Sequence, residues 1–345
     1  MKAISKNDEM AFGKRVRGQD HWENSGWGLY LLDRKKETEF LVWTSPYIVR
    51  AGNEFFEDII TVQTLLAKRS LNELRVLKDN DFVYKGWDVP DHLSEEDLTI
   101  REGKSSITWS VDGRSYSFGD GSWKILGMHA GVGMDLVLTP FGDSIWYVGP
   151  PMDPLKKGEG WYWAFADVRG RISSGGEAFR VEGMGIHERH VIHGPRFDMV
   201  NETKGQGFTW FLGLGKKFRF LLSNFRGRGT EFYFLRGSSR FKTQRGIDME
   251  ITEEWLDPRS KFSPPSRWHI TVDTGEVYLN ANVSSYLRAY YPWTFMKHSN
   301  NVLYFFLSSL FGYYRLKIDG WKKVEFSKQD RSYVHTNWAF HVGSG

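Results

Sequence analysis

A cluster of polar side chains lies in the segment GMGIHERHVIHG, Gly183–Gly194. Within it, three histidines, a glutamate and an arginine fall in the seven residues His187 to His193. Side chains of these types can bind a metal ion, transfer protons, or form the polar edge of an ordinary strand. The local secondary structure decides among the three, because it determines which side chains share a face.

Metal binding is the option that the spacing favours least. His187, His190 and His193 would lie roughly on one side of a helix, but the surrounding residues have strand character, and on a strand His187 and His190 point to opposite faces. The zinc motif His-Glu-x-x-His is also not met, because only two residues separate the first two histidines. We therefore expect no metal at this cluster.

Acid–base chemistry is the option that we prefer for His187, Glu188, Arg189 and His190. On a strand, His187 and Arg189 share one face, and Glu188 and His190 share the other. Burial favours the neutral form of a carboxyl or imidazole group, and such a group can deliver a proton to an alkene or a carbonyl. The pattern does not determine which pair faces inward.

Two features near the cluster could form a ligand site, namely a pair of glycines and a set of tryptophans. A bulge at Gly183 and Gly185 would reverse the alternation, and their missing side chains would leave room for a ligand if they face inward. Aromatic rings can stabilise a carbocation through cation–π contacts. We expect four tryptophans to line the substrate site: Trp43, Trp161, Trp163 and Trp210.

Strands dominate the rest of the chain. Aromatic residues make up 16%, glycines number 36, and hairpin signals such as Asp112-Gly113 recur between alternating segments. We predict an all-β fold of two lipocalin-like antiparallel barrels in tandem, residues 1–200 and 201–345, with one or two short helices. The helices are expected over Phe55–Leu77, from its apolar spacing, and after Ser94. A propeller is disfavoured because no fixed repeat occurs, and a pair of β-sandwiches is the third choice.

Composition excludes several classes of protein. The chain has no cysteine, so disulfides and thiolate metal sites are impossible. The N-terminus lacks the apolar core of a signal peptide, and the longest apolar run, Asn301–Tyr314, is too short to span a bilayer, so we expect a cytoplasmic protein without stable membrane insertion. The 46 basic and 42 acidic residues are interspersed, which argues against nucleic-acid binding. No Gly-x-Ser-x-Gly elbow is present.

Four segments resemble a known family, the double lipocalin-like proteins that include carotenoid 1,2-hydratase, AttH-type proteins and fungal Diels–Alderase-like cyclases. The segments are HWENSGWGLYLLDR (His21–Arg34), WKILGMHAGVGMDLVLTPFGDSIWYVG (Trp123–Gly149), GWYWAFADVRGRISSGGEAFRVEGMGIHERHV (Gly160–Val191) and SRWHITVDTGEVYLNANV (Ser266–Val283). The resemblance covers most of the chain and implies two lipocalin-like barrels. Its members hydrate, cyclise or simply bind apolar molecules.

The polar cluster departs from that family. The hydratases read approximately Tyr-His-Asp-His-Asn-Trp-Gly, of which His187 and Glu188 match a histidine and an acid, whereas Arg189 replaces the second histidine. The resemblance therefore implies the fold more firmly than the reaction. We expect a cofactor-independent hydratase, cyclase or isomerase of an apolar isoprenoid or polyene, with a ligand site in or beside the first barrel. A lipid carrier and a sugar-binding protein are the alternatives, and the oligomeric state is left open.

Overall fold

The structure is a computed structural model that describes residues 3–10, 21–50, 59–71, 82–85, 93, 95–148, 158–193, 208–215, 218–225, 229–236, 239–256, 263, 265–284, 286–290, 303–310, 314–318, 323–327 and 332–337. The described residues form β-strands, turns and short 3-10 helices. The chain divides into two compact units, and each is described by itself below. The all-β, lipocalin-like fold class predicted above is confirmed.

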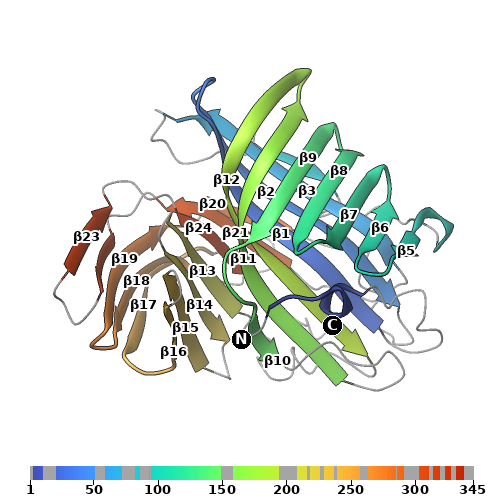
Figure 1. The fold of residues 1–345 in the computed structure, drawn as a ribbon. Helices are drawn as coiled ribbons and strands as arrows, with labels where there is room; N and C mark the ends of the chain where they lie inside the picture. The colour runs from blue at the N-terminus through green and yellow to red at the C-terminus, as the bar shows by residue number, and fades with distance from the viewer. Residues whose placement is uncertain are drawn as a thin grey trace, which may run out of the picture. The chain divides into compact units, whose positions relative to one another are not determined.

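The first unit contains one large antiparallel sheet (Figure 1). Its strands follow the order β4-β3-β2-β1-β12-β11-β9-β8-β7-β6-β5, and β10 pairs with β11. Neighbours along this order are consecutive in the sequence, except that β1 pairs with β12 and β9 with β11. The strands are β1 (His21–Asp33), β2 (Thr38–Arg50), β3 (Ile59–Ser70), β4 (Phe82–Lys85), β5 (Thr99–Glu102), β6 (Ile107–Val111), β7 (Arg114–Gly119), β8 (Ser122–His129), β9 (Val132–Pro140), β10 (Ile145–Val148), β11 (Gly158–Ser174) and β12 (Glu177–His193).

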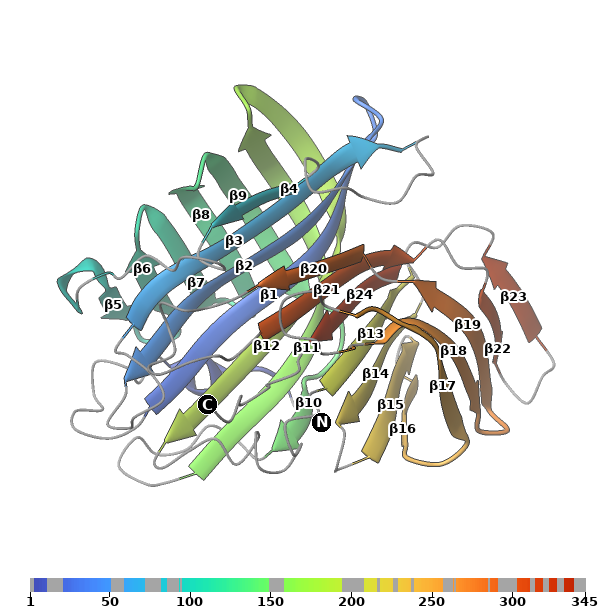
Figure 2. The same cartoon turned by 180° about the vertical axis from the view of Figure 1, so that it is seen from behind.

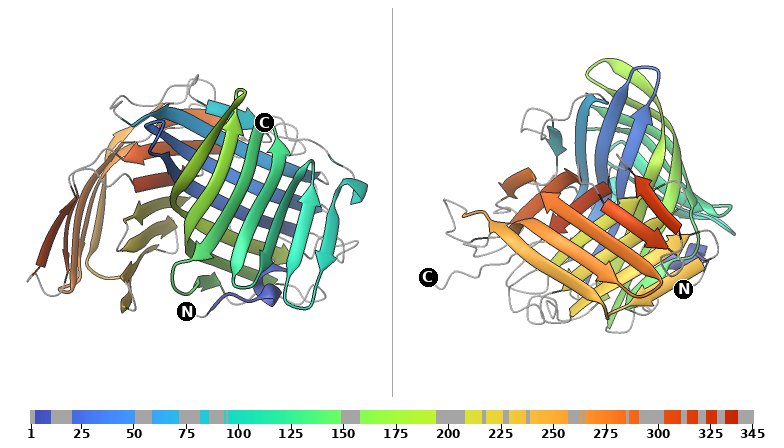
Figure 3. Two further views of the ribbon diagram at one scale, coloured as in Figure 1. Left: turned by 45° about the horizontal axis from the view of Figure 1, so that its top comes forward. Right: turned by 90° about the vertical axis from the view of Figure 1, so that its left-hand side faces the viewer.

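This sheet curls on itself, so that β1, β2 and β3 pass behind β7, β8 and β9 in the left view of Figure 3. Figure 2 shows the same strands β1–β4 from behind. The side chains between the two layers form one apolar core, which includes Trp27 of β1, Val42 of β2, Trp123 of β8 and Val181 of β12. We call the side of the sheet that carries these side chains the core face. The other side is the opposite face.

Turn residues produce the hairpins where the sequence predicted them. Asp112 and Gly113 both adopt positive φ, at 45° and 71°, as a two-residue hairpin turn between β6 and β7 requires. Gly175 and Gly176, at 61° and 80°, reverse the chain between β11 and β12. The turn after Asp33 likewise joins β1 to β2.

The predicted helix over Phe55–Leu77 is wrong wherever the structure describes this segment, because Ile59–Ser70 is strand β3. Ile60, Val62 and Leu66 point to the core face, while Leu65 and Ala67, on the opposite face, are also buried. A strand that is buried on both faces loses its apolar–polar alternation, and its apolar spacing then imitates a helix. The β-branched run from Ile59 to Val62 was the signal that favoured a strand.

Among the described residues of the first unit, the helices are single 3-10 turns, η1 (Lys6–Glu9) and η3 (Glu95–Asp97). The second agrees with the short turn expected after Ser94, although Ser94 itself lies outside the described residues. In the part of the chain that the structure describes, no helix is long and apolar enough to cross a membrane.

The second unit contains two antiparallel sheets, ordered β16-β15-β14-β13-β24-β21-β20 and β17-β18-β19-β22-β23. Its core includes Phe211, Phe220, Phe232, Trp268 and Val272. The strands are β13 (Phe208–Leu214), β14 (Arg219–Phe225), β15 (Gly229–Arg236), β16 (Ser239–Thr243), β17 (Ile247–Glu254), β18 (Pro265–Asp273), β19 (Val277–Ser284), β20 (Tyr286–Tyr290), β21 (Leu303–Leu310), β22 (Tyr314–Ile318), β23 (Lys323–Ser327) and β24 (Ser332–Asn337).

The bulge considered at Gly183 and Gly185 does not occur. The pairing of β1 with β12 runs without a shift from Leu32 opposite Glu182 to His21 opposite His193. The space left by the two missing side chains is not open either: a Cβ at Gly185 would lie 2.5 Å from the Leu29 side chain, and one at Gly183 would meet the backbone of β1. The glycines therefore serve the close packing of β12 against β1.

Gly183→Ala is therefore expected to destabilise the protein. The added Cβ would collide with the carbonyl oxygen of Tyr30, a backbone atom that cannot rotate away. We expect a loss of about 1–3 kcal/mol in the free energy of unfolding, measured by urea denaturation. Glu182→Ala, at an exposed neighbouring position, is the control and should change the urea midpoint little. A midpoint for Gly183→Ala equal to that of the control would contradict the expected collision.

Candidate functional site

The register of β12 divides the polar cluster between the two faces of the sheet. His187 lies directly opposite Trp27 and points to the core face, and Arg189 shares this face. Glu188 and His190 point to the opposite face, where both contact Trp161 of β11. The question that the sequence left open, which pair faces the core, is thereby answered in favour of His187 and Arg189.

His187 is completely buried among aromatic rings. It stacks on Trp27, with ring centroids 4.6 Å apart, and lies 4.8 Å from the Trp123 ring and 5.6 Å from the Tyr162 ring. Its Nδ1 lies 3.0 Å from the carbonyl oxygen of Gly26, and its Nε2 lies 2.8 Å from Oε1 of Glu9. Both ring nitrogens are thus occupied by partners within the protein.

The two hydrogen bonds determine where the protons of this pair lie. A carbonyl oxygen only accepts, so Nδ1 of His187 must carry a hydrogen, and the contact with Glu9 then needs one further proton. Burial on its own raises the pKa of Glu9, but the charge of His187 and hydrogen bonds from His187 and Tyr162 lower the pKa below its ordinary value of 4.5. The carboxylate form of Glu9 is therefore favoured.

Arg189 is a further buried basic side chain of the core face. Its Nη1 donates to the carbonyl oxygen of Asn24 at 2.8 Å, and its Nη2 donates to the carbonyl oxygen of Met10 at 2.5 Å and to the carboxylate of Glu23. The guanidinium lies 5.0 Å from the Trp109 ring centroid. Arg189 thus ties β12 to β1 and to the N-terminal segment that carries Glu9.

The core face around His187 is filled by the protein's own side chains. Trp27 is sandwiched between His187 and Tyr116, whose ring centroid is 5.0 Å away at an interplanar angle of 4°. His187, Arg189 and Glu23 are each 0% exposed. We infer that this charged cluster holds the N-terminal segment against the end of the sheet.

On the opposite face, Glu188 carries a buried carboxyl group whose pKa is raised, whereas that of Glu9 is lowered. Glu188 is 5% exposed, and burial raises its pKa from 4.5 to about 8, although hydrogen bonds from the side chains of Trp161 and Asn24 lower it in part. Nε1 of Trp161 donates to Oε1 of Glu188 at 2.9 Å. The hydroxyl of Tyr47 is also buried, and burial together with the Glu188 charge raises its pKa well above 10. Glu188 is therefore a neutral acid at pH 7.

Aromatic rings surround this acid. The Trp161 ring stacks on His190, with centroids 4.3 Å apart and an interplanar angle of 10°. Trp163, directly opposite Glu188 in the ladder, lies 5.0 Å from Trp161, and the half-buried Tyr147 lies 5.2 Å from Trp161. We call Tyr47, Tyr147, Trp161, Trp163, Glu188 and His190 the acid face.

Trp43 lies beside the acid face, because its indole fills the space over a glycine of the neighbouring strand. A Cβ at Gly26, which lies directly opposite Glu188 on β1, would meet the Trp43 indole at 2.6 Å, so this ring occupies the space next to Glu188. Its Nε1 lies 3.4 Å from Oε1 of Gln63. Trp210 lies on β13 in the second unit, and its side chain is outside the described residues.

Two residues in contact with His187, namely Glu9 and Tyr162, were not predicted from the sequence. Glu9 lies far from β12 along the chain, in a segment without periodicity, and nothing in the sequence pairs it with His187. Tyr162 could have been found, because it alternates with Trp161 and Trp163 and must therefore point to the core face. Among the described residues, no group of three or more His, Asp or Glu side chains is arranged to hold a metal ion.

The raised pKa of Glu188 predicts a dependence of stability on pH. Between pH 4.5 and about 8 the folded protein keeps a proton that the unfolded chain releases, so this group lowers stability as pH rises through that range. Thermal unfolding of wild type and Glu188→Gln at several pH values should therefore show a difference that grows in favour of the variant, by at most about 1.4 kcal/mol per pH unit. A constant difference from pH 5 to 8 would show that the carboxyl has an ordinary pKa.

Comparisons with known proteins establish the fold. No protein-family model and no curated protein sequence matches the chain. Several solved structures match it over nearly its whole length. Two of them are the crystal structures of a provisionally named AttH from Nitrosomonas europaea (11% identity, TM-score 0.59, 97% of each chain covered) and of kievitone hydratase from Nectria haematococca (10% identity, TM-score 0.56, covering 98% of this chain and 93% of the hydratase). At this identity the likeness shows a shared fold, the one that the sequence resemblance implied.

Proposed function

We propose that this protein is an enzyme that protonates an apolar, unsaturated small molecule, with Glu188 as the proton donor and no cofactor. The observation that carries the proposal is a buried carboxyl group with a pKa of about 8 that lies among aromatic rings. A general acid works best when its pKa lies near the working pH, which burial achieves here. The substrate class that fits such surroundings is an isoprenoid or a polyene.

The reaction begins with transfer of the Glu188 proton to an alkene carbon. A C–H bond forms, the π bond breaks, and the neighbouring carbon becomes cationic. The faces of Trp161, Trp163 and Tyr147 offer negative π density to such a cation. Water then adds and loses a proton to give an alcohol, or a second alkene of the substrate adds to close a ring and the new cation loses a proton from a neighbouring carbon. The proton released in that step returns to the Glu188 carboxylate, so that the enzyme is regenerated.

The hydrogen bonds to Glu188 assist this step. The indole N–H of Trp161 and the amide of Asn24 stabilise the charged form of the carboxyl, which is the form left behind after proton transfer. His190 contacts the far side of the same indole, so we assign it the role of orienting Trp161. His187 and Arg189 are not assigned a chemical step, because their polar groups are engaged with Glu9, Glu23 and backbone carbonyls.

The fold comparison supports the same class of reaction, since one of the similar structures bears the name of a hydratase. The sugar-binding alternative is disfavoured by the apolar, buried character of this wall. Trp43, Trp161 and Trp163 are 5%, 1% and 1% exposed, and the hydroxyl groups of a sugar would lose their water in such surroundings. A carrier of the same apolar ligands would use the same aromatic wall, and the experiment below separates it from an enzyme.

The proposal is tested by incubating the purified protein in D2O, without added cofactor, with a panel of polyenes and prenylated phenols. Proton transfer from a carboxyl group that has exchanged with solvent would place one deuterium on carbon in the product, which mass spectrometry detects. Ligand binding without any deuterated product would identify a carrier instead. A hydrophilic sugar found bound to the purified protein by native mass spectrometry would contradict the proposed substrate class.

A further inference from the structure

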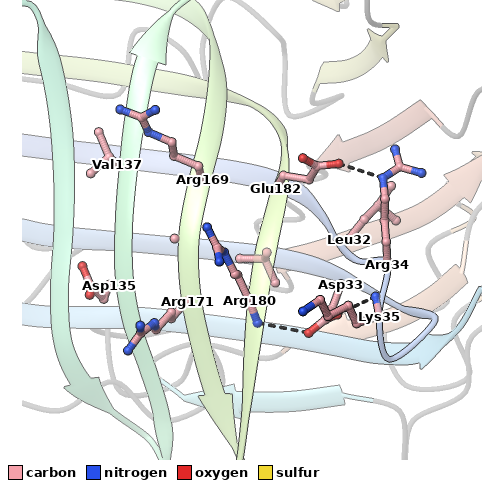
Figure 4. Close-up of a pocket in the computed structure, with 12 residues that line it drawn as sticks. Leu32, Asp33, Arg34, Lys35, Asp135, Val137, Arg169, Arg171, Arg180 and Glu182 are labelled. Atoms are coloured by element: carbon pink, nitrogen blue, oxygen red, sulfur yellow. Dashed lines mark hydrogen bonds and ion pairs between the residues drawn. The ribbon is translucent and has the colours of Figure 1, made fainter.

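A groove of about 820 Å³ lies on the opposite face of the first unit, where β9, β11 and β12 run beside the β1–β2 turn (Figure 4). It is about six residues along β12 from Glu188, a distance of roughly 20 Å, and so is separate from the acid face. Its charged lining is mainly basic, with five cations: Arg34, Lys35, Arg169, Arg171 and Arg180. Three acids also line it: Asp33, Asp135 and Glu182.

Three of the arginines are held close together by the sheet. Arg169 and Arg171 are two residues apart on β11, so they share a face at a spacing of roughly 7 Å. Arg180 lies directly opposite Arg171 in the β11–β12 ladder, where Cβ atoms are about 5 Å apart. Figure 4 shows all three side chains on the groove side of these strands. A directly opposed pair of like charges is unfavourable for the sheet unless something compensates it.

Acids of the groove lie next to these arginines in the sheet, since Glu182 is directly opposite Arg169, but among the described residues none forms an ion pair with them. Both carboxylate oxygens of Asp33 accept backbone N–H groups, from Lys35, Lys36 and Arg180. Glu182 pairs with Arg34 at 2.7 Å.

The remaining acid, Asp135, lies directly opposite Arg171 on β9. Within the described residues, however, no ion pair joins it to Arg171, and none involves the side chains of Arg169 or Arg180. The groove therefore keeps an excess of positive charge, with five cations against three acids, and these three arginines are not ion-paired among the described residues.

We propose that this groove is a binding site for a phosphate-bearing ligand, held by Arg169, Arg171 and Arg180. A guanidinium group matches two oxygens of a phosphate through parallel N–H bonds, and a dianionic or larger group can engage several arginines at once. A monocarboxylate would balance only one of the three. The ligand is either a soluble phosphate monoester or diphosphate, or a phospholipid headgroup that ends in a phosphate monoester.

Binding is measured on the full-length protein with two probes, inorganic diphosphate by calorimetry and vesicles of phosphatidylcholine with or without phosphatidic acid by flotation. We expect diphosphate to bind, and the double variant Arg171→Gln/Arg180→Gln to bind at least ten-fold more weakly. Arg101→Gln removes an exposed arginine of β5 and should bind as wild type does. Vesicle binding that diphosphate displaces identifies a lipid headgroup as the ligand, and binding of diphosphate alone identifies a soluble phosphate monoester or diphosphate.

Two further measurements show whether weaker binding reflects lost charge or a loss of folded structure. The double variant should melt no lower than wild type, because it removes opposed like charges. Glu182→Gln removes a negative charge and releases Arg34, so it should tighten diphosphate binding several-fold. The proposal is overturned if neither probe binds wild type, if the double variant binds diphosphate as wild type does, or if Glu182→Gln weakens binding.

Discussion

Glu188→Gln is expected to reduce turnover by about 10²–10⁴-fold while leaving ligand affinity nearly unchanged. Glutamine keeps the size of the side chain and can still accept the hydrogen bond from Trp161, but it has no acidic proton to transfer. The measurement is kcat and Kd for the substrate that the D2O experiment identifies, compared between wild type and variant. The expected signature is a loss in kcat, with Kd within a factor of a few of wild type.

The pH profile provides the second part of this result. Because a pKa of about 8 keeps Glu188 protonated at neutral pH, wild-type activity should be level below pH 7 and should fall above pH 8. Glu182→Gln, an exposed glutamate on the same face of the same strand, is the matched control and should retain full activity. Turnover that survives in Glu188→Gln would assign the chemistry elsewhere, with His187 as the next residue to replace.

Arg189→Met is expected to lower the free energy of unfolding by about 3–5 kcal/mol. The substitution leaves the Glu23 carboxylate completely buried without its guanidinium partner, and it also removes donors from the carbonyl oxygens of Asn24 and Met10. Urea denaturation measures the loss. Arg101→Met, at an exposed position of β5, should cost less than about 0.5 kcal/mol.

A double variant distinguishes the charge effect from lost packing. Glu23→Gln/Arg189→Met removes both charges, so it should recover a large part of the stability that Arg189→Met loses. Its turnover should also remain, since neither residue lies on the acid face. If the double variant is no more stable than the single one, buried charge is not the cause. If it folds and has lost turnover, the core face takes part in catalysis and the assignment of roles given above is wrong.

The sequence determined the fold class because strand signals are local. Turn pairs such as Asp112-Gly113 need only their own backbone angles, and alternating segments need only their own pattern. Strand Ile59–Ser70 was predicted as a helix. It is buried on both faces, so its sequence does not alternate between apolar and polar residues as a half-exposed strand would.

The sequence also determined that neighbouring histidines of the HERHVIH segment lie on different faces of the sheet. A strand places His187 and His190 on opposite faces whatever the rest of the fold does. It further placed Trp161 and Trp163 on one face of β11, which proved to be the face of Glu188.

Only the tertiary structure decided which side of β12 faces the core and which groups meet there. The unshifted β1–β12 register places His187 opposite Trp27. Glu9, in the 3-10 turn η1, contacts His187 although 178 residues separate the two along the chain. The raised pKa of Glu188 likewise depends on burial beside Trp161 and Asn24, from two other strands. Register, long-range contacts and desolvation are properties of several segments together, so no single segment of the sequence contains them.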